Sequence, residues 1–277
     1  MTIREAIQQR ISVRTYQPAD PDFETIANIQ DILTQSIIAP FSGKPRFQLI
    51  RQNLGENIKI GTYGFIRDAQ YFIAGAIHRD RFAEVDFGFV FEKIILDLTA
   101  LGLGTCWLGG TFSRGDFAKL LNLKNDEIIP CVSPVGLPAE NKRLAEKLLR
   151  RAVGADNRKR WDELFFQDHM DAPLPRENAG DYEVVLELLR LAPSASNKQP
   201  WRIIRHNEAY HFFLKRTAGY ARHFSSVDLQ LVDIGIAMCH WLLMAKELDL
   251  EGYWHRFDTG PDLPKKVPLD YVVSWMV

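Results

Sequence analysis

Apolar residues recur at helical spacing in some segments of the chain and as short continuous runs in others. The pattern predicts helices over residues 3–9, 23–38, 85–101, 141–151 and 182–191. It predicts strands over residues 48–51, 71–77, 130–138 and 202–205. A run as continuous as 71–77 favours a strand that is buried on both faces. The sequence therefore predicts a chain in which helices and strands alternate.

The segment 191–201, Leu-Ala-Pro-Ser-Ala-Ser-Asn-Lys-Gln-Pro-Trp, joins a predicted helix to a predicted strand. Pro193 ends the helix and Pro200 disfavours a new one, so the residues between them form a loop. Ser194 and Asn197 place a hydroxyl and a carboxamide in that loop, and such groups suit the polar edge of a planar heterocycle. An ordinary connection made of turn residues explains the same composition. Both interpretations stay open at this point.

A second candidate site lies near the N-terminus, where the sequence is Arg10-Ile11-Ser12-Val13-Arg14. In an extended segment, alternate side chains share a face, so Arg10, Ser12 and Arg14 point the same way. Two guanidinium groups beside a hydroxyl can clamp a phosphate through charge-assisted hydrogen bonds. The alternative is an exposed basic strand face.

A glycine-rich segment, residues 102–112, follows the long apolar helix predicted over 85–101. It is a poor dinucleotide-binding fingerprint, because it follows a helix instead of a strand and Trp107 occupies the place of the third glycine. Gly109 and Gly110 would allow a backbone N–H to approach a ligand closely. Glycines that serve only tight turns are the alternative interpretation.

The second half of the chain repeats the first. Residues 39–51 parallel 192–205, with one extra residue in the later loop, and Val-Asp-Phe-Gly-Phe at 85–89 parallels Val-Asp-Ile-Gly-Ile at 232–236. The order of predicted elements agrees as well, which indicates a duplicated unit. We expect a first half over 1–166, a linker over 167–180 and a second half over 181–277.

The two copies differ where the candidate chemistry lies. The R-x-S-x-R motif occurs only in the first copy, and the P-S-x-x-N-x-Q-P-W motif only in the second, where the first copy has Phe41, Gly43 and Arg46 instead. A two-fold arrangement of two such units creates two equivalent sites. One of these sites would keep both motifs, and the other would have lost both.

Composition narrows the partners that the chain can have. A formal net charge of -1 over 277 residues gives no global attraction for nucleic acid or an anionic membrane. We find no signal-peptide pattern and no apolar run of membrane-spanning length. The three cysteines lie far apart and the seven histidines show no metal-ligand spacing, so we expect reduced cysteines, a cytoplasmic location and no catalytic metal.

Taken together, these motifs resemble the nitroreductase family of FMN enzymes, which usually form homodimers with FMN bound between subunits. Residues 10–14, 101–109, 130–138 and 192–201 match the family's motifs, and Arg158-x-Arg160 resembles its closing motif. The loop motif comes last here, as in the single-chain pseudo-dimer form known as the putative TM nitroreductase type. The resemblance implies an α+β fold (an α/β sandwich), with mainly antiparallel central sheets flanked by helices and the second half acting as the partner subunit.

The resemblance also implies roles for individual residues. The FMN phosphate and ribityl chain would be held by Arg10, Ser12, Arg14, Arg158 and Arg160. The backbone near flavin N5 and O4 would be that of Leu108, Gly109 and Gly110. The ring would be met from the other half by Pro193, Ser194, Ala195 and Asn197. The wall of the acceptor cleft would include Phe41, Tyr63 and Phe65, for each of which core packing is the alternative.

By the same resemblance, NAD(P)H would reduce FMN and leave, and a small planar acceptor such as a nitroaromatic or a quinone would take its place. The flavin carries the chemistry in such a ping-pong reaction, so no protein nucleophile or general acid is needed. This agrees with a sequence that offers no convincing Ser/His/Asp or Cys/His set. The alternative from another class is a flavin-binding or structural relative without turnover. A single chain would suffice in either case.

Overall fold

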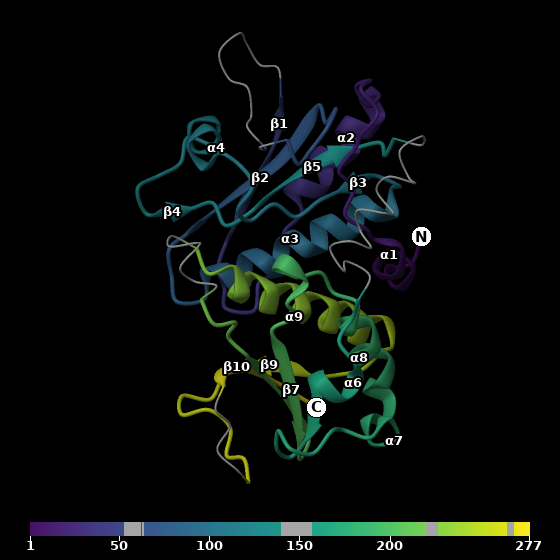
Figure 1. Cartoon of the computed structure of the whole chain (residues 1–277), viewed down its shortest axis with the longest axis vertical. Helices are drawn as coiled ribbons and strands as arrows, with labels where there is room; N and C mark the ends of the chain where they lie inside the picture. The colour runs from purple at the N-terminus through teal and green to yellow at the C-terminus, as the bar shows by residue number, and fades with distance from the viewer. Residues whose placement is uncertain (53–61, 63, 140–156, 220–226, 265–268) are drawn as a thin grey trace.

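The computed structural model describes residues 1–52, 62, 64–139, 157–219, 227–264 and 269–277. Two five-stranded sheets lie at opposite ends of the molecule, and two long helices lie side by side between them (Figure 1). These helices are α3 (Ala83–Ala100) and α9 (Leu229–Glu247), one from each half of the chain. The architecture is therefore a pair of related layers joined through their central helices.

The first sheet has the strand order β1-β2-β5-β3, and a short strand, β4, also pairs with β2. All its pairings are antiparallel. Its strands are β1 (Arg46–Arg51), β2 (Tyr71–His78), β3 (Gly104–Thr105), β4 (Glu127–Ile128) and β5 (Val132–Gly136). Seven of the eight residues of β2 are buried or half-buried, as its continuous apolar run predicts.

The second sheet has the order β6-β7-β8-β10-β9, in which β6 runs parallel to β7 and the other pairs are antiparallel. Its strands are β6 (Phe165–Gln167), β7 (Trp201–His206), β8 (Ala209–Leu214), β9 (Tyr253–His255) and β10 (Asp270–Met276). The predicted α+β fold with mainly antiparallel sheets and two tandem related halves is confirmed. Strand β6 spans the predicted boundary at 166/167 and pairs with the second sheet.

Shorter helices complete the fold. They are α1 (Ile3–Gln9), α2 (Phe23–Thr34), α4 (Arg114–Leu120), α6 (Trp161–Leu164), α7 (Arg176–Ala179) and α8 (Glu183–Arg190), with 3-10 turns η2 (Gly180–Tyr182) and η3 (Ala195–Asn197). Two of them, α1 and α8, pack against the central helices. Helix α1 begins at a capping box, in which Thr2 Oγ1 accepts from Glu5 N–H at 3.2 Å and Glu5 Oε2 accepts from Thr2 N–H at 2.9 Å. The helix expected over 141–151 lies outside the described residues.

Two glycines allow the central helices to touch through their backbones. A Cβ atom added to Gly88 would lie 2.2 Å from the carbonyl oxygen of Val232, and one added to Gly235 would lie 2.0 Å from that of Val85. The two contacts are reciprocal, because each glycine meets the valine that stands three residues before the other glycine. The repeated Val-Asp-x-Gly sequence therefore forms the pseudo-two-fold contact between the halves.

Our expectation that no apolar run has membrane-spanning length was wrong for one element. Helix α9 has 19 residues and is apolar enough to cross a bilayer by length and composition alone. In the structure, however, 78% of its apolar window is buried inside the protein. Its apolar character on all sides follows from its position between the two sheets, as in the core helix of a large domain.

Candidate functional site

The R-x-S-x-R segment begins where α1 ends. It is extended and lies beside β3, since Val13 N–H donates to Thr105 O at 2.8 Å and Ser12 forms a bridge with the same residue. Val13 is 4% exposed and packs against Gly104, where an added Cβ would lie 2.9 Å from the valine side chain. With Val13 in the core, alternation places Arg10, Ser12 and Arg14 on the opposite face of the segment.

The loop between α8 and β7 is held by its own polar groups. Asn197 N–H donates to Ser194 O at 2.9 Å, and Gln199 N–H donates to Ser194 Oγ at 2.8 Å. Ser196, Asn197 and Gln199 have φ angles of 50°, 53° and 45°, a left-handed region that non-glycine residues rarely adopt. Strained backbone of this kind persists where the surrounding structure holds it and is frequent at ligand sites.

The segment 157–159 is attached to this loop and brings Arg158 to it. Asn197 Nδ2 donates to Asn157 O at 2.7 Å, and Lys159 N–H donates to Gln199 Oε1 at 2.7 Å. Arg158 Nη2 donates to Leu191 O at 3.0 Å, and its Nη1 donates to Asn197 Oδ1 at 3.2 Å. The Asn and Gln of the loop motif thus serve to fix an arginine that is distant in sequence.

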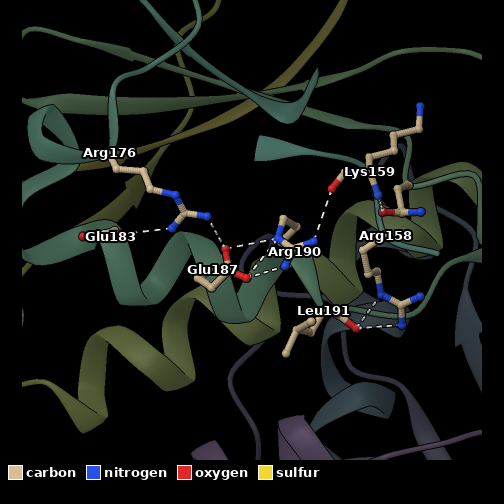
Figure 2. Close-up of polar contacts among 8 residues, drawn as sticks. Arg158, Lys159, Arg176, Glu183, Glu187, Arg190 and Leu191 are labelled. Atoms are coloured by element: carbon tan, nitrogen blue, oxygen red, sulfur yellow. Dashed lines mark hydrogen bonds and ion pairs between the residues drawn. The ribbon is translucent and has the colours of Figure 1, made fainter. Parts of the chain in front are cut away.

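Helix α8 supports the same segment from its other side (Figure 2). Arg190 Nη1 donates to Lys159 O at 3.3 Å, and Arg190 also pairs with Glu187. Glu187 in turn pairs with Arg176 at 3.0 Å. Figure 2 shows this row of charges running along α8 toward Arg158, whose guanidinium group lies over the carbonyl of Leu191. The position of Arg158 is therefore set by the end of α8 as well as by the loop.

These segments surround a cavity of about 430 Å³, a size typical of small-molecule sites. Its lining comes from both halves and consists of Arg10, Ser12, Arg14, Trp107, Gly109, Cys131, Arg158, Pro193, Ser194, Ala195, Ser196, Asn197, Leu229, Val232, Asp233 and Ile236. Three guanidinium groups face a single carboxyl group in this lining. Such a composition favours a ligand that is anionic at one end and has an apolar part.

Gly109 lies where the first half meets α9. Its carbonyl accepts a hydrogen bond of 2.6 Å from Arg114 Nη2, and Arg114 also donates to Ile129 O and Pro130 O. Burial lowers the pKa of Arg114 from its usual value. A Cβ added to Gly109 would lie 2.8 Å from the side chain of Leu229, so glycine permits the close approach of α9. The backbone at Gly109 is thereby held rigidly at the edge of the cavity.

A buried polar chain lies behind the Trp107 wall of the cavity. Trp107 Nε1 donates to Glu92 Oε2 at 2.8 Å, and Glu92 Oε1 lies 2.9 Å from His240 Nε2. His240 Nδ1 lies 3.1 Å from Leu188 O. The side chains of Glu92 and His240 are 0% and 1% exposed. This chain joins α3 of the first half to α9 and α8 of the second.

The structure brings together nine of the twelve residues that the sequence suggested for cofactor binding. These are Arg10, Ser12, Arg14, Gly109, Arg158, Pro193, Ser194, Ala195 and Asn197. The other three lie outside the lining. Leu108 is 4% exposed and pairs with Val132, Gly110 is exposed, and the side chain of Arg160 is 77% exposed and pairs with Asp162.

The suggested acceptor wall is not assembled at this cavity. Phe41 stacks on Phe82 with ring centroids 4.2 Å apart and belongs to the loop of the first half, the loop that lacks the motif. Phe65 is 53% exposed and lies outside the lining. Tyr63 lies outside the described residues. The role of these three aromatics in acceptor binding stays a prediction.

The lining also includes Ser196, whose hydroxyl the sequence already placed in the candidate loop. Sequence reasoning missed six other lining residues, which are Trp107, Cys131, Leu229, Val232, Asp233 and Ile236. Four of them lie on one face of α9, where apolar spacing alone indicates core packing. Asp233 could have been found, because a carboxylate in an otherwise apolar helix is unusual and the repeat contains it twice. Among the described residues, no group of three or more His, Cys, Asp or Glu side chains could hold a metal ion.

Comparisons with known proteins bear on the family and the fold of this chain. Residues 2–245 match the family model described as "Putative TM nitroreductase". The chain shares its fold with a solved structure from Thermotoga maritima described as a "putative nitroreductase", with a TM-score of 0.63, 21% identity and coverage of 100% of this chain and 94% of that one. No curated protein matched the chain.

Shorter solved structures match about half of the chain. One is a nitroreductase with bound FMN from Desulfitobacterium hafniense, with a TM-score of 0.40, 19% identity and coverage of 50% of this chain and 91% of that one. Another, from Desulfovibrio desulfuricans, is described as a putative nitroreductase in complex with FMN, with a TM-score of 0.39, 23% identity and coverage of 53% and 95%.

Proposed function

The chain belongs to the putative TM nitroreductase family, and from this premise we propose that it is an FMN-dependent oxidoreductase. The observation that carries the proposal is the cavity in which Arg10 and Arg14 of the first half face Ser194 and Asn197 of the second. Two motifs separated by most of the chain meet there. The D. hafniense and D. desulfuricans structures, which are described as holding FMN, support the identity of the cofactor.

The residues present suit FMN by their chemistry. Guanidinium groups bind phosphate through paired charge-assisted hydrogen bonds, and Arg10, Arg14 and Arg158 offer three of them. Ser12 and Ser194 offer hydroxyls for a polyol chain, and the apolar face of α9 offers a surface for a planar ring. The excess of guanidinium over carboxyl groups favours an anion in this cavity.

FMN supplies the electron-transfer chemistry when it is bound, and the residues of this chain bind, orient and shield it. Arg10, Ser12 and Arg14 would hold its phosphate end. The rigid backbone at Gly109 and the loop at Ser194 would position its ring. None of the lining residues is a histidine, and burial raises the pKa of the Cys131 thiol, which makes it a poor nucleophile. This lining is consistent with a reaction that the cofactor carries out instead of a protein side chain.

The finer parts of the proposal concern the reaction partners. We propose that NAD(P)H reduces the bound FMN and leaves, and that a small planar acceptor such as a nitroaromatic or a quinone then takes the electrons. We also propose one FMN per chain and a cytoplasmic location. The location is supported by the three cysteines, all of which lie in the described part of the chain as buried thiols without a disulfide.

The proposal is tested by loading purified protein with FMN and measuring binding, reduction and turnover. We expect one FMN per chain, bleaching of its absorbance by NADH or NADPH under anaerobic conditions, and reoxidation by a nitroaromatic or a quinone. Arg10→Ala and Arg14→Ala should each weaken FMN binding about tenfold or more, because each removes a charged hydrogen-bond donor worth about 1.5–3 kcal/mol.

Arg51→Ala is the matched control, because Arg51 forms a surface pair with Asp20 and lies outside the cavity lining. It removes the same charge and should leave FMN binding unchanged. A protein that takes up no FMN would refute the proposal. A protein that binds one FMN but is not reduced by either nicotinamide would favour the alternative, a flavin-binding relative without turnover.

A further inference from the structure

Two aspartates occupy equivalent positions at the start of the central helices. Asp86 in α3 and Asp233 in α9 both precede the glycine of the repeated Val-Asp-x-Gly sequence. Each accepts a hydrogen bond from the loop of its own half. The chain therefore contains two versions of the same contact, one beside the cavity and one at the equivalent place that lacks both motifs.

The two contacts differ in one hydrogen bond. Asp86 has both oxygens satisfied, since Oδ1 accepts from Phe41 N–H at 2.9 Å and Oδ2 accepts from Gly43 N–H at 2.6 Å. Asp233 Oδ1 accepts from Ala195 N–H at 2.9 Å. Its Oδ2 is buried and has no hydrogen-bond partner among the described residues. Only the copy beside the cavity thus has an unused oxygen.

The second loop offers Asp233 one donor where the first loop offers Asp86 two. Two of its later backbone N–H groups are used within the loop, because Asn197 donates to Ser194 O and Gln199 donates to Ser194 Oγ. One oxygen of Asp233 is left without a partner among the described residues. A buried polar atom in this state costs about 1–3 kcal/mol, so it is retained only where something compensates.

Asp233 also lines the cavity, although the residue is only 2% exposed. Burial raises the pKa of Asp233 well above its usual range, and the nearby charge of Asp228 raises it further. Burial therefore favours the neutral form of this carboxyl group, which has one O–H donor to offer. A neutral donor inside a buried cavity suits an acceptor atom of a ligand.

We propose that Asp233 is a further cofactor-binding residue, whose carboxyl group joins Ala195 N–H on one side to an acceptor atom of bound FMN on the other. The inference rests on the proposed function, because it takes FMN as the ligand of the cavity. The donor would stabilise electron density on the ring, and more so after reduction, when that density increases. Asp233 would then act on the reduction potential as well as on affinity.

The test compares Asp233→Asn and Asp233→Leu in the full chain, with the FMN dissociation constant measured by fluorescence quenching. An Asn side chain can accept from Ala195 N–H through Oδ1 and donate through Nδ2, so Asp233→Asn should bind FMN within about threefold of wild type. Asp233→Leu lacks the donor and should bind about tenfold more weakly, the value of one hydrogen bond. If the donor favours the reduced flavin tenfold, its potential in Asp233→Leu should be about 30 mV more negative.

Asp86→Asn is the matched control. Asp86 accepts from two backbone N–H groups, so in Asp86→Asn the amide nitrogen, itself a donor, would face one of these donors. It should lower the unfolding midpoint and leave FMN affinity unchanged, which is the opposite of the pattern at Asp233. A second readout is the infrared band of the protonated carboxyl group, which should shift when FMN binds to wild type and should be absent from Asp233→Asn.

The outcomes separate the two proposals. A wild-type protein that binds no FMN would refute the proposed function and this inference with it. FMN binding of wild-type strength in Asp233→Leu would refute the inference alone. A tenfold loss in Asp233→Asn would also refute it, because that result would mean that an ionised Asp233 accepts a hydrogen bond from the ligand.

Discussion

Replacing Gly88 by alanine tests whether backbone contact between the central helices holds the two halves together. The new Cβ would lie 2.2 Å from the carbonyl oxygen of Val232, and at Gly235 the distance to Val85 would be 2.0 Å. Cβ atoms essentially never approach other heavy atoms closer than 3.0 Å. The helices would therefore have to separate by at least 0.8 Å for the first substitution and 1.0 Å for the second, the differences from 3.0 Å.

The expected cost follows from what that separation disturbs. The clashing atoms belong to backbone, which cannot rotate away, so the cost lies at the upper end of the range for overpacking, about 3 kcal/mol. Alanine regains about 1 kcal/mol of helix propensity relative to glycine. We therefore expect each of Gly88→Ala and Gly235→Ala to lower the free energy of unfolding by about 2 kcal/mol. FMN affinity should fall as well, because α9 carries one wall of the cavity.

Urea unfolding followed by circular dichroism measures the loss. One displacement of the helices relieves both clashes, so the double variant should lose less than the sum of the two single losses. Gly115→Ala is the control, since Gly115 lies in α4 and an added Cβ there has nothing within 4 Å. It should be as stable as wild type or more stable. If Gly88→Ala behaved like this control, the proposed role of the helix contact would be wrong.

Two further predictions concern buried charges. Arg46 holds the pKa of Glu127 at about 2, below its usual value, so the pair stabilises the fold above about pH 4.5 and loses that contribution as the pH falls toward 2. Glu127→Gln should therefore reduce the change in the free energy of unfolding across that pH window. The reduction should be about 1–2 kcal/mol, because solvent screens the half-exposed Arg46. An unchanged dependence on pH would contradict this prediction. Glu92→Leu should lower the free energy of unfolding by about 3–5 kcal/mol, since it leaves His240 and Trp107 without their shared partner; chemical denaturation would show a wild-type midpoint if the pair contributes nothing.

The sequence predicted the parts of the site that carry their own local signal. Prolines bound the loop at 193–200, alternation places Arg10 and Arg14 on one face, and the repeat indicates that the halves are related. These features are visible in the sequence itself, so they can be recognised without knowing how the chain packs. The meeting of the two motifs followed from the resemblance to a dimeric family, and the structure places both on one cavity.

The remaining features depend on contacts between segments that are distant in sequence. Arg158 and Arg160 look alike in sequence, yet Arg158 is held over the end of α8 while Arg160 pairs with Asp162 on the surface. Asp86 and Asp233 are equivalent in sequence too, yet different backbone N–H groups of the two loops reach them. No pattern of residue types contains that information.

The position of Phe41 illustrates how fusion of two halves changes a site. In a symmetric homodimer each substitution appears in both sites, so neither site can be given up alone. In a single chain the two sites vary independently. Here Phe41, equivalent to Ser194 of the cavity loop, stacks on Phe82, over which Arg256 of the second half lies 5.0 Å from the ring centroid. The side that lost its motifs thus contributes a cation–π contact between the halves, with the Phe41–Phe82 stack beneath it, and this contact stabilises the half-to-half arrangement on which the other site depends.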